Sequence, residues 1–318
     1  MNRLYKYRSY NNKSLDELRN QQIWFSHGEY LNDPFDFHKI IKELNNKYSF
    51  HDIKELHKAN LIGGKTLESV LISMGGDIGV LSLSKCWNSK LLWSRYGNSD
   101  RGFCIEFEFT DPIQGENTIV TNSIMKSSTS SIEALEVSYF DDFKIPTIKN
   151  LEASKGDFFR RIFVAKSIEW KSEGEFRILR QLGTKFRVQN QVQLISKLVS
   201  DKTDEKSKII NENCWKLHEL MNKPLQSIKR EEIIQIAAQI DKETNDEEII
   251  KYSKEISNSA RGRLYEFPSK IKSIIFGLLT PKEHKKEIKK IVIEMQLEIK
   301  FREVFENSNN ELEIRELQ

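Results

Sequence analysis

The sequence contains little cysteine. Its three cysteines, Cys86, Cys104 and Cys214, have no spacing that matches a metal-binding pattern. An odd number of cysteines without such a pattern is typical of free thiols in a reducing compartment. We therefore expect a cytoplasmic protein.

Long hydrophobic stretches are also missing. No run of the sequence approaches the roughly 18 consecutive apolar residues that a membrane-spanning helix needs. The first residues, MNRLYKYRSYNN, lack the apolar core of a signal peptide. We therefore expect neither a signal peptide nor a membrane partner.

Neither sign of charge dominates the chain. Lys and Arg number 50 and Asp and Glu number 47, which gives a net charge of +3. Such a balance does not predict nucleic-acid binding from the global charge, although a local basic surface is still compatible with it. The 318 residues, 38% of them hydrophobic, are enough for one large domain or for a domain with an insertion.

The first part of the chain is rich in strand patterns. Strands are expected at residues 3–10, 22–26, 77–85 and 102–109. Ser14 and Glu17 form a capping-box pattern, which predicts a short helix from about Leu15. In the third strand Ser82 and Ser84 share one face. Small hydroxyl residues at alternate positions can line the floor of a cavity, but they are equally compatible with an ordinary strand face.

The segment 102–109 is the clearest strand of the sequence, because apolar and other residues alternate along its whole length. Its four apolar positions are predicted to face a core, and Cys104, Glu106 and Glu108 to face away from it. Just before it, Ser89 or its neighbour Asn88 can cap a helix that ends at Gly97.

The second part of the chain changes in character near residue 188. The further elements expected there are a strand at 134–140, a helix at 158–166, helices between 188 and 260, a strand at 270–279, a helix from Pro281, and two closing antiparallel strands joined through 307–310. This pattern predicts an α+β protein with a mixed or antiparallel sheet. Its core domain would span residues 1–187 and 264–318, with a helical insertion at 188–263.

The stretch 165–180 carries the strongest sign of a chemical site. As a strand, it would place Glu173, Glu175 and Arg177 on one face. Two carboxylates and a guanidinium are costly to bury unless they are paired or used. The alternative is an edge strand with a solvated charged face.

Several motifs together resemble a bacterial family known only as a domain of unknown function, number two-nine-seven-one. These motifs are LYKYRS, FSHGEYLNDPFDF, LSLSKCWNSKLLWSRYG, RGFCIEFEF, EWKSEGEFRIL and KIKSIIFGLL. They cover residues 3–40, 77–110, 160–180 and 264–318. The resemblance implies a cytosolic bacterial protein in a toxin or phage-defence setting.

The order of three motifs also resembles the ADP-ribosyltransferase fold. That fold has an Arg or His on its first strand, a Ser or Tyr on a middle strand, and a catalytic Glu on a late strand. Here Arg8 stands on the first strand, LSLS on the middle one, and Glu173 and Glu175 in SEGEF. In relatives that modify DNA bases a His stands at the position of Lys6.

This second resemblance implies NAD as the substrate, with a protein or a nucleic acid as the acceptor of ADP-ribose. A carboxylate of Glu173 or Glu175 would stabilise an oxocarbenium-like transition state, with Arg177 beside it as a further catalytic residue or simply as their ion-pair partner. Arg8 would pair with a phosphate. The remaining NAD-binding residues implied are Tyr7, Ser82, Ser84, Trp93 and Tyr96.

Two other functions are compatible with the sequence. Carboxylates could hold Mg²⁺ in a nuclease, assisted by Lys85 or Lys166. The candidate ligands are Asp33, Asp36, Glu106, Glu108, Glu173 and Glu175. Alternatively, the protein is a non-enzymatic sensor whose helical segment 188–263 binds a protein partner. The lysines of KEHKKEIKKI form either a solvated helix face or a nucleic-acid patch.

Overall fold

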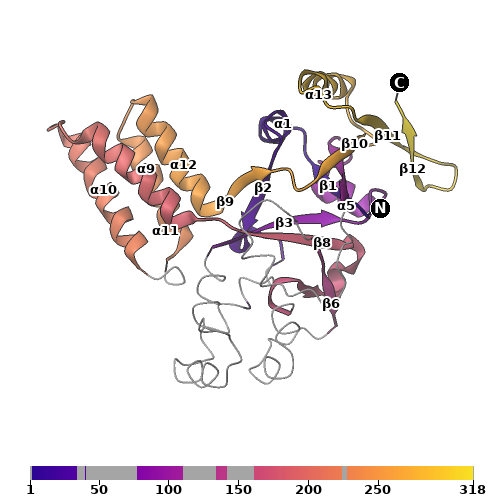
Figure 1. The fold of residues 1–318 in the computed structure, drawn as a ribbon, viewed down its shortest axis with the longest axis horizontal. Helices are drawn as coiled ribbons and strands as arrows, with labels where there is room; N and C mark the ends of the chain where they lie inside the picture. Colours follow the sequence, from indigo (N-terminus) through magenta and orange to yellow (C-terminus); the bar gives the residue numbers. More distant parts are fainter. Residues whose placement is uncertain are drawn as a thin grey trace.

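The computed structural model describes residues 2–33, 40, 77–109, 134–141, 161–223 and 228–317 (Figure 1). Within these ranges the protein is α+β, with a central mixed sheet and several helices. A helical bundle stands at one end of the sheet and a β-hairpin at the other (Figure 1). None of the helices in these ranges has both the length and the apolar surface needed to cross a bilayer.

Ten strands of the described ranges form the sheet, in the order β12-β11-β10-β4-β1-β3-β2-β9, with β8 and then β5 attached beside β3. Their bounds are β1 Asn2–Arg8, β2 Gln22–His27, β3 Ile78–Ser84, β4 Phe103–Phe109, β5 Leu135–Glu136, β8 Glu175–Gln181, β9 Gly262–Glu266, β10 Lys270–Phe276, β11 Lys300–Glu306 and β12 Leu312–Glu316. Only β10 and β11 pair in parallel here, because α13 (Lys282–Glu294) crosses between them. A separate small sheet pairs β6 (Ser138–Phe140) with β7 (Ala165–Ser167).

The sheet divides at β3. Along its whole length, one edge of β3 pairs with β8. The other edge is shared, because β1 pairs with it only at Tyr5↔Ser84 and β2 only at Ser26↔Val80 and His27↔Gly79. A strand edge can hold one partner at each position, so β1 and β2 must diverge from one another. The divergence leaves a split between them beside Leu81–Leu83.

Each face of the sheet has its own apolar core. On one face, α1 (Asn12–Arg19) and α13 pack over the largest cluster, with Leu18 and Ile288 among the fully buried side chains. On the other face, α5 (Lys90–Tyr96) buries Trp93 edge-on against Tyr7. Two short 3₁₀ helices, η1 (Gly28–Tyr30) and η2 (Ile168–Glu173), follow β2 and precede β8.

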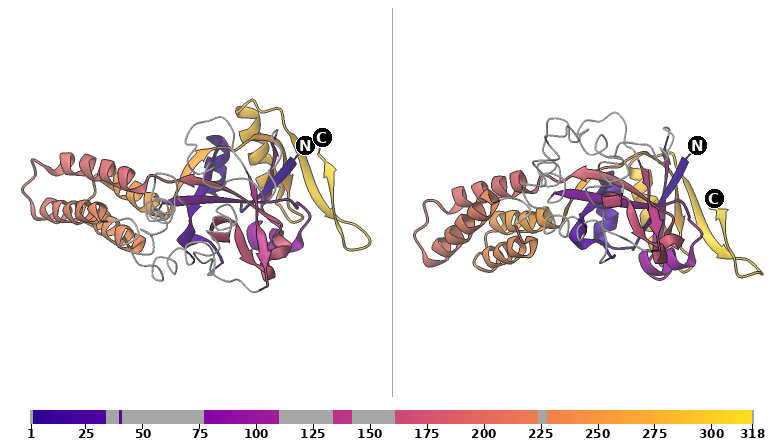
Figure 2. Two further views of the ribbon diagram at one scale, coloured as in Figure 1. Left: turned by 60° about the horizontal axis from the view of Figure 1, so that its bottom comes forward. Right: turned by 90° about the horizontal axis from the view of Figure 1, so that it is seen from below.

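Four helices form the bundle, and they enclose a separate apolar core. They are α9 (Thr184–Val199), α10 (Glu205–Asn222), α11 (Arg230–Lys242) and α12 (Glu247–Arg261). Figure 2 shows the bundle projecting from one end of the sheet. The buried carboxylate of Asp77 joins the two parts, because it accepts from the backbone N–H of Thr184 at 3.0 Å and pairs with Arg230 at 3.4 Å.

Most predicted elements are present, with several corrections to their limits. The strand predicted at 134–140 is divided into β5 and β6, and Lys166 lies on β7 rather than at the end of a helix. The helix near Leu15 is capped by Asn11 instead of Ser14, since the Asn11 side chain accepts from Ser14 N at 3.0 Å. The strand β9 was not predicted.

The apolar residues of β4 face the largest core as predicted, but its other face is not solvated. Glu106 is completely buried, and Cys104 belongs to the second apolar core. The Glu106 carboxylate is compensated by Arg3 at 3.1 Å, by Arg302 at 3.2 Å and by the hydroxyl of Ser273. Alternation in the sequence therefore marked the strand correctly, but both of its faces are covered.

Candidate active site

A cavity of about 510 Å³ lies at the split between β1 and β2. Side chains from both faces of β1 line it, together with the start of α1, residues of β2 and β3, α5 and the η2–β8 corner. The polar and aromatic lining residues that the chemistry below depends on are Lys6, Tyr7, Arg8, Lys13, Glu17, Trp24, Tyr30, Ser82, Ser84, Arg95, Tyr96, Lys166, Glu173 and Glu175. The volume is within the range of about 300–1,000 Å³ that is usual for small-molecule sites.

Arg8 enters the cavity from the end of β1. Its Nη2 lies 2.6 Å from Oε2 of Glu17 on α1. The buried Nε has no hydrogen-bond partner among the described residues. A buried guanidinium N–H without an acceptor is costly, so this side chain fits an anionic ligand such as a phosphate. The N-terminus of α1 adds a weaker preference for negative charge.

The two serines of β3 have different roles. The Ser84 hydroxyl donates to the Glu173 carbonyl at 2.7 Å and accepts from Cys86 N at 3.0 Å, so it stabilises the backbone. The Ser82 hydroxyl hydrogen-bonds the Glu175 carboxylate and helps to lower its pKa. Ser82 is therefore the serine that acts directly on a candidate catalytic group.

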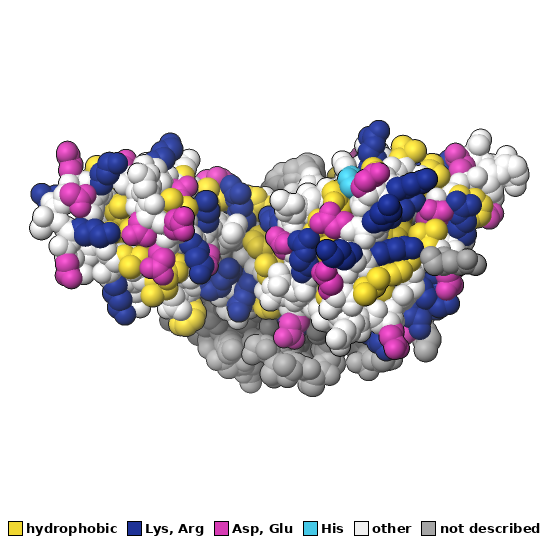
Figure 3. Space-filling model, turned by 90° about the horizontal axis from the view of Figure 1, so that it is seen from above, with side chains coloured by type: hydrophobic (Ala, Val, Ile, Leu, Met, Phe, Trp, Pro, Cys, Tyr) yellow, Lys and Arg dark blue, Asp and Glu magenta, His cyan; other side chains and the backbone are white. Residues whose placement is uncertain are grey.

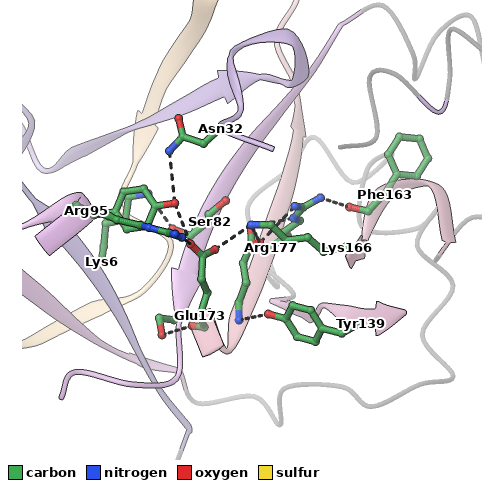
Figure 4. Close-up of polar contacts among 12 residues, drawn as sticks. Lys6, Asn32, Ser82, Arg95, Tyr139, Phe163, Lys166, Glu173 and Arg177 are labelled. Atoms are coloured by element: carbon green, nitrogen blue, oxygen red, sulfur yellow. Dashed lines mark hydrogen bonds and ion pairs between the residues drawn. The ribbon is translucent and has the colours of Figure 1, made fainter. Parts of the chain in front are cut away.

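Glu173 and Glu175 converge on one ammonium group. Lys166 Nζ donates to Glu173 at 2.8 Å and to Glu175 at 3.0 Å (Figure 4). The prediction that the two glutamates alternate along one strand is wrong, because Glu173 ends η2 and only Glu175 belongs to β8. Gly174, with φ +50°, turns the chain between them in the left-handed region that glycine favours.

Arg177 lies beneath this pair and does not line the cavity. It is completely buried; its Nε donates to Glu175 at 2.9 Å and its Nη1 to the Phe163 carbonyl at 3.1 Å (Figure 4). Burial disfavours the charged carboxylate, but Arg177 and then Lys166 outweigh it and lower the pKa of Glu175 to about 2. Glu175 is therefore ionised at neutral pH, and Arg177 positions it instead of contacting a ligand.

Tyr96 and Arg95 of α5 complete the carboxylate cluster. The Tyr96 hydroxyl donates to Glu173 at 3.0 Å and accepts from Asn32 at 3.4 Å, and Arg95 lies 3.6 Å from Glu173. Trp170 in η2 stacks beneath the cations, with Lys166 4.4 Å from its ring. The side chains at this edge of the cavity are therefore polar and are joined to one another by hydrogen bonds and ion pairs.

Lys6 is unusual among the cations of the cavity. Its Nζ donates to the Ser82 carbonyl at 2.8 Å, on the edge of β3 that the split leaves without a strand partner. It forms no ion pair within the described ranges. Burial and the charge of Arg8 together lower the pKa of Lys6 to about 7, so its protonation can change near neutral pH.

The structure brings together most of the residues that the sequence singled out. Tyr7, Arg8, Ser82, Ser84, Tyr96, Glu173 and Glu175 all line the cavity. Trp93 does not, since it is completely buried in the core behind α5 and cannot stack on a ligand. The Tyr7 hydroxyl donates to the Cys86 carbonyl at 2.8 Å, which ties down its polar end.

Sequence reasoning missed several lining residues, among them Trp24, Tyr30 and Arg95. Their local sequence carries no signal, because they reach the cavity only through the splaying of β1 and β2. For Lys166 the sequence indicates only an accessory role in a nuclease. Its pairing with two glutamates depends on β7, a strand of three residues that no pattern marks.

The described candidate metal ligands of the nuclease alternative do not form a metal site, although Asp33, Glu173 and Glu175 all line the cavity. Glu106 and Glu108 lie on β4 outside the cavity lining, and Asp36 lies outside the described residues. Within the described ranges, no three His, Cys, Asp or Glu side chains are close enough to hold a metal. Lys166 occupies the position between Glu173 and Glu175 that a cation would need.

Part of the chain is similar to one family of known proteins. Residues 92–178 match the model of a family described as "Protein of unknown function (DUF2971)". This match covers less than half of the chain, and it includes Arg95, Tyr96, Lys166, Glu173 and Glu175 but not Arg8 or Ser82. No curated protein and no solved structure matches the chain.

Proposed function

We propose that the protein cleaves the bond between nicotinamide and ribose in NAD, and transfers the ADP-ribosyl group to an acceptor or to water. One observation carries the proposal. Arg8, Ser82 and Glu175 are far apart in sequence and stand on three different strands, yet all line one cavity at the split of the sheet. The proposal includes an ADP-ribosyltransferase-like core.

Glu175 has the protonation state that this reaction needs. When the C1′–N bond breaks, its electron pair remains on nicotinamide and positive charge develops on the ribose, as in glycoside hydrolysis. An ionised carboxylate stabilises that charge, and it can accept a hydrogen bond from a ribose hydroxyl. The acceptor then bonds to C1′ and releases a proton.

Arg8 supplies the complementary role at the other side of the split. Its unpaired Nε and the start of α1 fit the pyrophosphate of a dinucleotide. Aromatic lining residues, Trp24 and Tyr96 among them, offer surfaces on which the nicotinamide or adenine ring can stack. Lys166 and Arg177 keep the Glu175 carboxylate ionised, and Lys166 orients it together with Glu173.

The test is release of nicotinamide from NAD by the purified protein. Glu175→Gln is expected to reduce release by at least a hundredfold, because the charge that stabilises the transition state is lost. Glu294→Gln on α13 is the matched control, since this exposed glutamate has Lys290, at 3.7 Å, as its one ion-pair partner within the described residues. Release that persists in Glu175→Gln would overturn the assignment.

Loss of folding must be separated from loss of chemistry, because Glu175→Gln removes the carboxylate charge that faces the buried Arg177; thermal unfolding of Glu175→Gln makes this check. Arg8→Lys is a second, milder variant at the other side of the cavity, since it keeps the charge but not the planar fork. We expect its KM for NAD to rise about tenfold with kcat nearly unchanged, and its thermal unfolding to match that of the wild type. Unchanged KM would remove Arg8 from the phosphate site.

We also propose that the bundle binds a protein partner, in a bacterial toxin or phage-defence setting. Trp215 on α10 is 60% exposed, and an exposed Trp on a helix face is typical of interaction surfaces. Trp215→Ala is expected to abolish recovery of the partner from the native host without changing nicotinamide release. Recovery of the same partner by this variant would refute the role of α10.

A further inference from the structure

Three arginines gather where the chain passes between the sheet and the helical bundle. Arg180 is near the end of β8, Arg187 is in the first turn of α9, and Arg263 is at the start of β9. Both connections to the bundle, from β8 into α9 and from α12 into β9, therefore pass through this arginine cluster. All three side chains are partly buried.

Tyr265 organises the cluster. The guanidinium of Arg180 lies 4.8 Å from the centre of the Tyr265 ring, and that of Arg263 lies 4.9 Å from it. Backbone carbonyls fix the other edges, since Arg187 donates to Gly262 O at 3.0 Å and Arg263 to Leu182 O at 3.3 Å. The guanidinium groups are thus held in place before any ligand arrives.

The positive charge of the cluster is not neutralised locally. None of the three arginines forms an ion pair with a carboxylate of the described ranges. Neighbouring carboxylates raise the pKa of two of these arginines by their charge, but they lie beyond ion-pair distance. Glu266 does so for Arg180, and Asp77 and Glu255 do so for Arg187. Burial first, and then the charge of Arg263, lower the pKa of Arg180 and Arg187. Like charges held together in a partly desolvated place favour an anionic ligand.

The cluster is separate from the candidate active-site cavity, because none of its three arginines is among the residues that line that cavity. Arg180 and Glu175 are an odd number of residues apart on β8, so Arg180 also points to the face of the sheet opposite Glu175. Seen from above, basic side chains gather at the junction between the bundle and the sheet (Figure 3). Phe186, the residue that precedes Arg187 on α9, is 69% exposed and is therefore an accessible aromatic surface one residue along the helix from the cluster.

We propose that Arg180, Arg187 and Arg263 bind phosphates of a single-stranded nucleic acid, with the Phe186 ring stacking on a base. Positive groups interleaved with an exposed aromatic ring are the combination that single-strand binding uses. A strand bound here would contact both connections between the sheet and the bundle. This inference does not depend on the proposed NAD chemistry.

The test is fluorescence anisotropy with a labelled single-stranded 15-mer of DNA or RNA, over a series of salt concentrations. Three phosphate contacts predict a slope of log K against log salt of about −2, and each Arg→Gln substitution should reduce its magnitude by about 0.7. Phe186→Ala should weaken binding about tenfold with little change of slope. Arg263→Lys should largely keep the slope.

The matched control is Lys286→Gln, which removes an exposed positive charge from α13. It should leave the affinity unchanged, whereas a loss equal to that of Arg263→Gln would mean nonspecific attraction and overturn the proposal. Thermal unfolding checks that each variant is folded. The proposal is also overturned if Arg263→Gln is folded and binds the labelled strand as tightly as the wild type does. It is overturned as well if AMP displaces the labelled strand at the same concentration as the unlabelled strand does.

Discussion

The Arg177 guanidinium is completely buried and holds the Glu175 carboxylate through two of its nitrogens, Nε at 2.9 Å and Nη2 at 3.3 Å. Because both groups are desolvated, each depends on the other. Replacing only the arginine leaves the buried Glu175 carboxylate with one of its two cationic partners, Lys166. We expect Arg177→Met to lower the free energy of unfolding by about 3–5 kcal/mol, as measured by urea denaturation at pH 7.

Arg19→Met is the control for this substitution, since Arg19 forms its ion pairs with Asp16 and Glu287 while 42% exposed. Exposed pairs contribute at most about 1 kcal/mol. If Arg177→Met were as mild as Arg19→Met, the buried pair would not stabilise the site.

Lys166 separates two carboxylates that would otherwise face each other across a short gap. Lys166→Met removes the shared ammonium, which lies 2.8 Å from Glu173 and 3.0 Å from Glu175. Two oxygen ligands released in this way can hold a hard divalent cation. We expect 5 mM Mn²⁺ to raise the melting temperature of Lys166→Met by a few degrees, roughly 1 kcal/mol, and to leave the wild type unchanged.

A parallel measurement on the double variant Lys166→Met/Glu173→Gln gives the control, because one ligand is then missing. A stabilisation by Mn²⁺ of the same size in the double variant would place the ion elsewhere. No response in either variant would mean that Arg177 alone satisfies the carboxylates.

The sequence predicted the strands of the core well, because alternation and turn residues mark them locally. The segment 102–109 is the best example, as β4 runs from Phe103 to Phe109. What could not be predicted is the environment of each face. The alternation gives no sign that Glu106 is buried. Its burial depends on Arg3 from β1 and Arg302 from β11, which compensate the charge of its carboxylate.

The candidate site shows the same division. Alternation placed Ser82 and Ser84 together correctly, since their partners along β8 are Arg177 and Glu175. The position of Glu173 depends on a left-handed Gly174, which no periodicity reveals. The cavity itself results from β1 and β2 sharing one edge of β3, a property of long-range pairing.

Asp77 should control how firmly the bundle is attached to the sheet. Its two carboxylate oxygens accept from Thr184 N at 3.1 and 3.0 Å, and one of them pairs with the buried Arg230. Asp77→Asn keeps a hydrogen-bond acceptor but removes the charge opposite Arg230. We expect a loss of about 3 kcal/mol in the free energy of unfolding, measured by urea denaturation.

Asp204→Asn is the matched comparison, because Asp204 caps α10 at 3.0 Å from Ser207 N, and Asn caps a helix about as well as Asp. Its free energy of unfolding should equal that of the wild type. Equal losses in the two variants would show that only the acceptor matters at Asp77, and not the ion pair.

The stability of the protein should rise with pH above neutrality because of Lys6. The pKa of Lys6 is about 7 in the folded protein against 10.5 for an unperturbed lysine. Between these values the unfolded chain binds more protons than the folded one, so the free energy of unfolding increases with pH. Below pH 7 the ammonium is charged in both states, and its desolvation cost is fully present.

Lys6→Met makes this testable, because it removes the titrating group and leaves the remaining cavity charges in place. We expect Lys6→Met to be more stable than the wild type at pH 6.5. The advantage should shrink from pH 7 to pH 10 by at most about 1.4 kcal/mol per pH unit, as measured by urea denaturation at each pH. A difference in stability that does not change with pH would mean that the Lys6 ammonium titrates as a solvated amine, with no desolvation cost in the cavity.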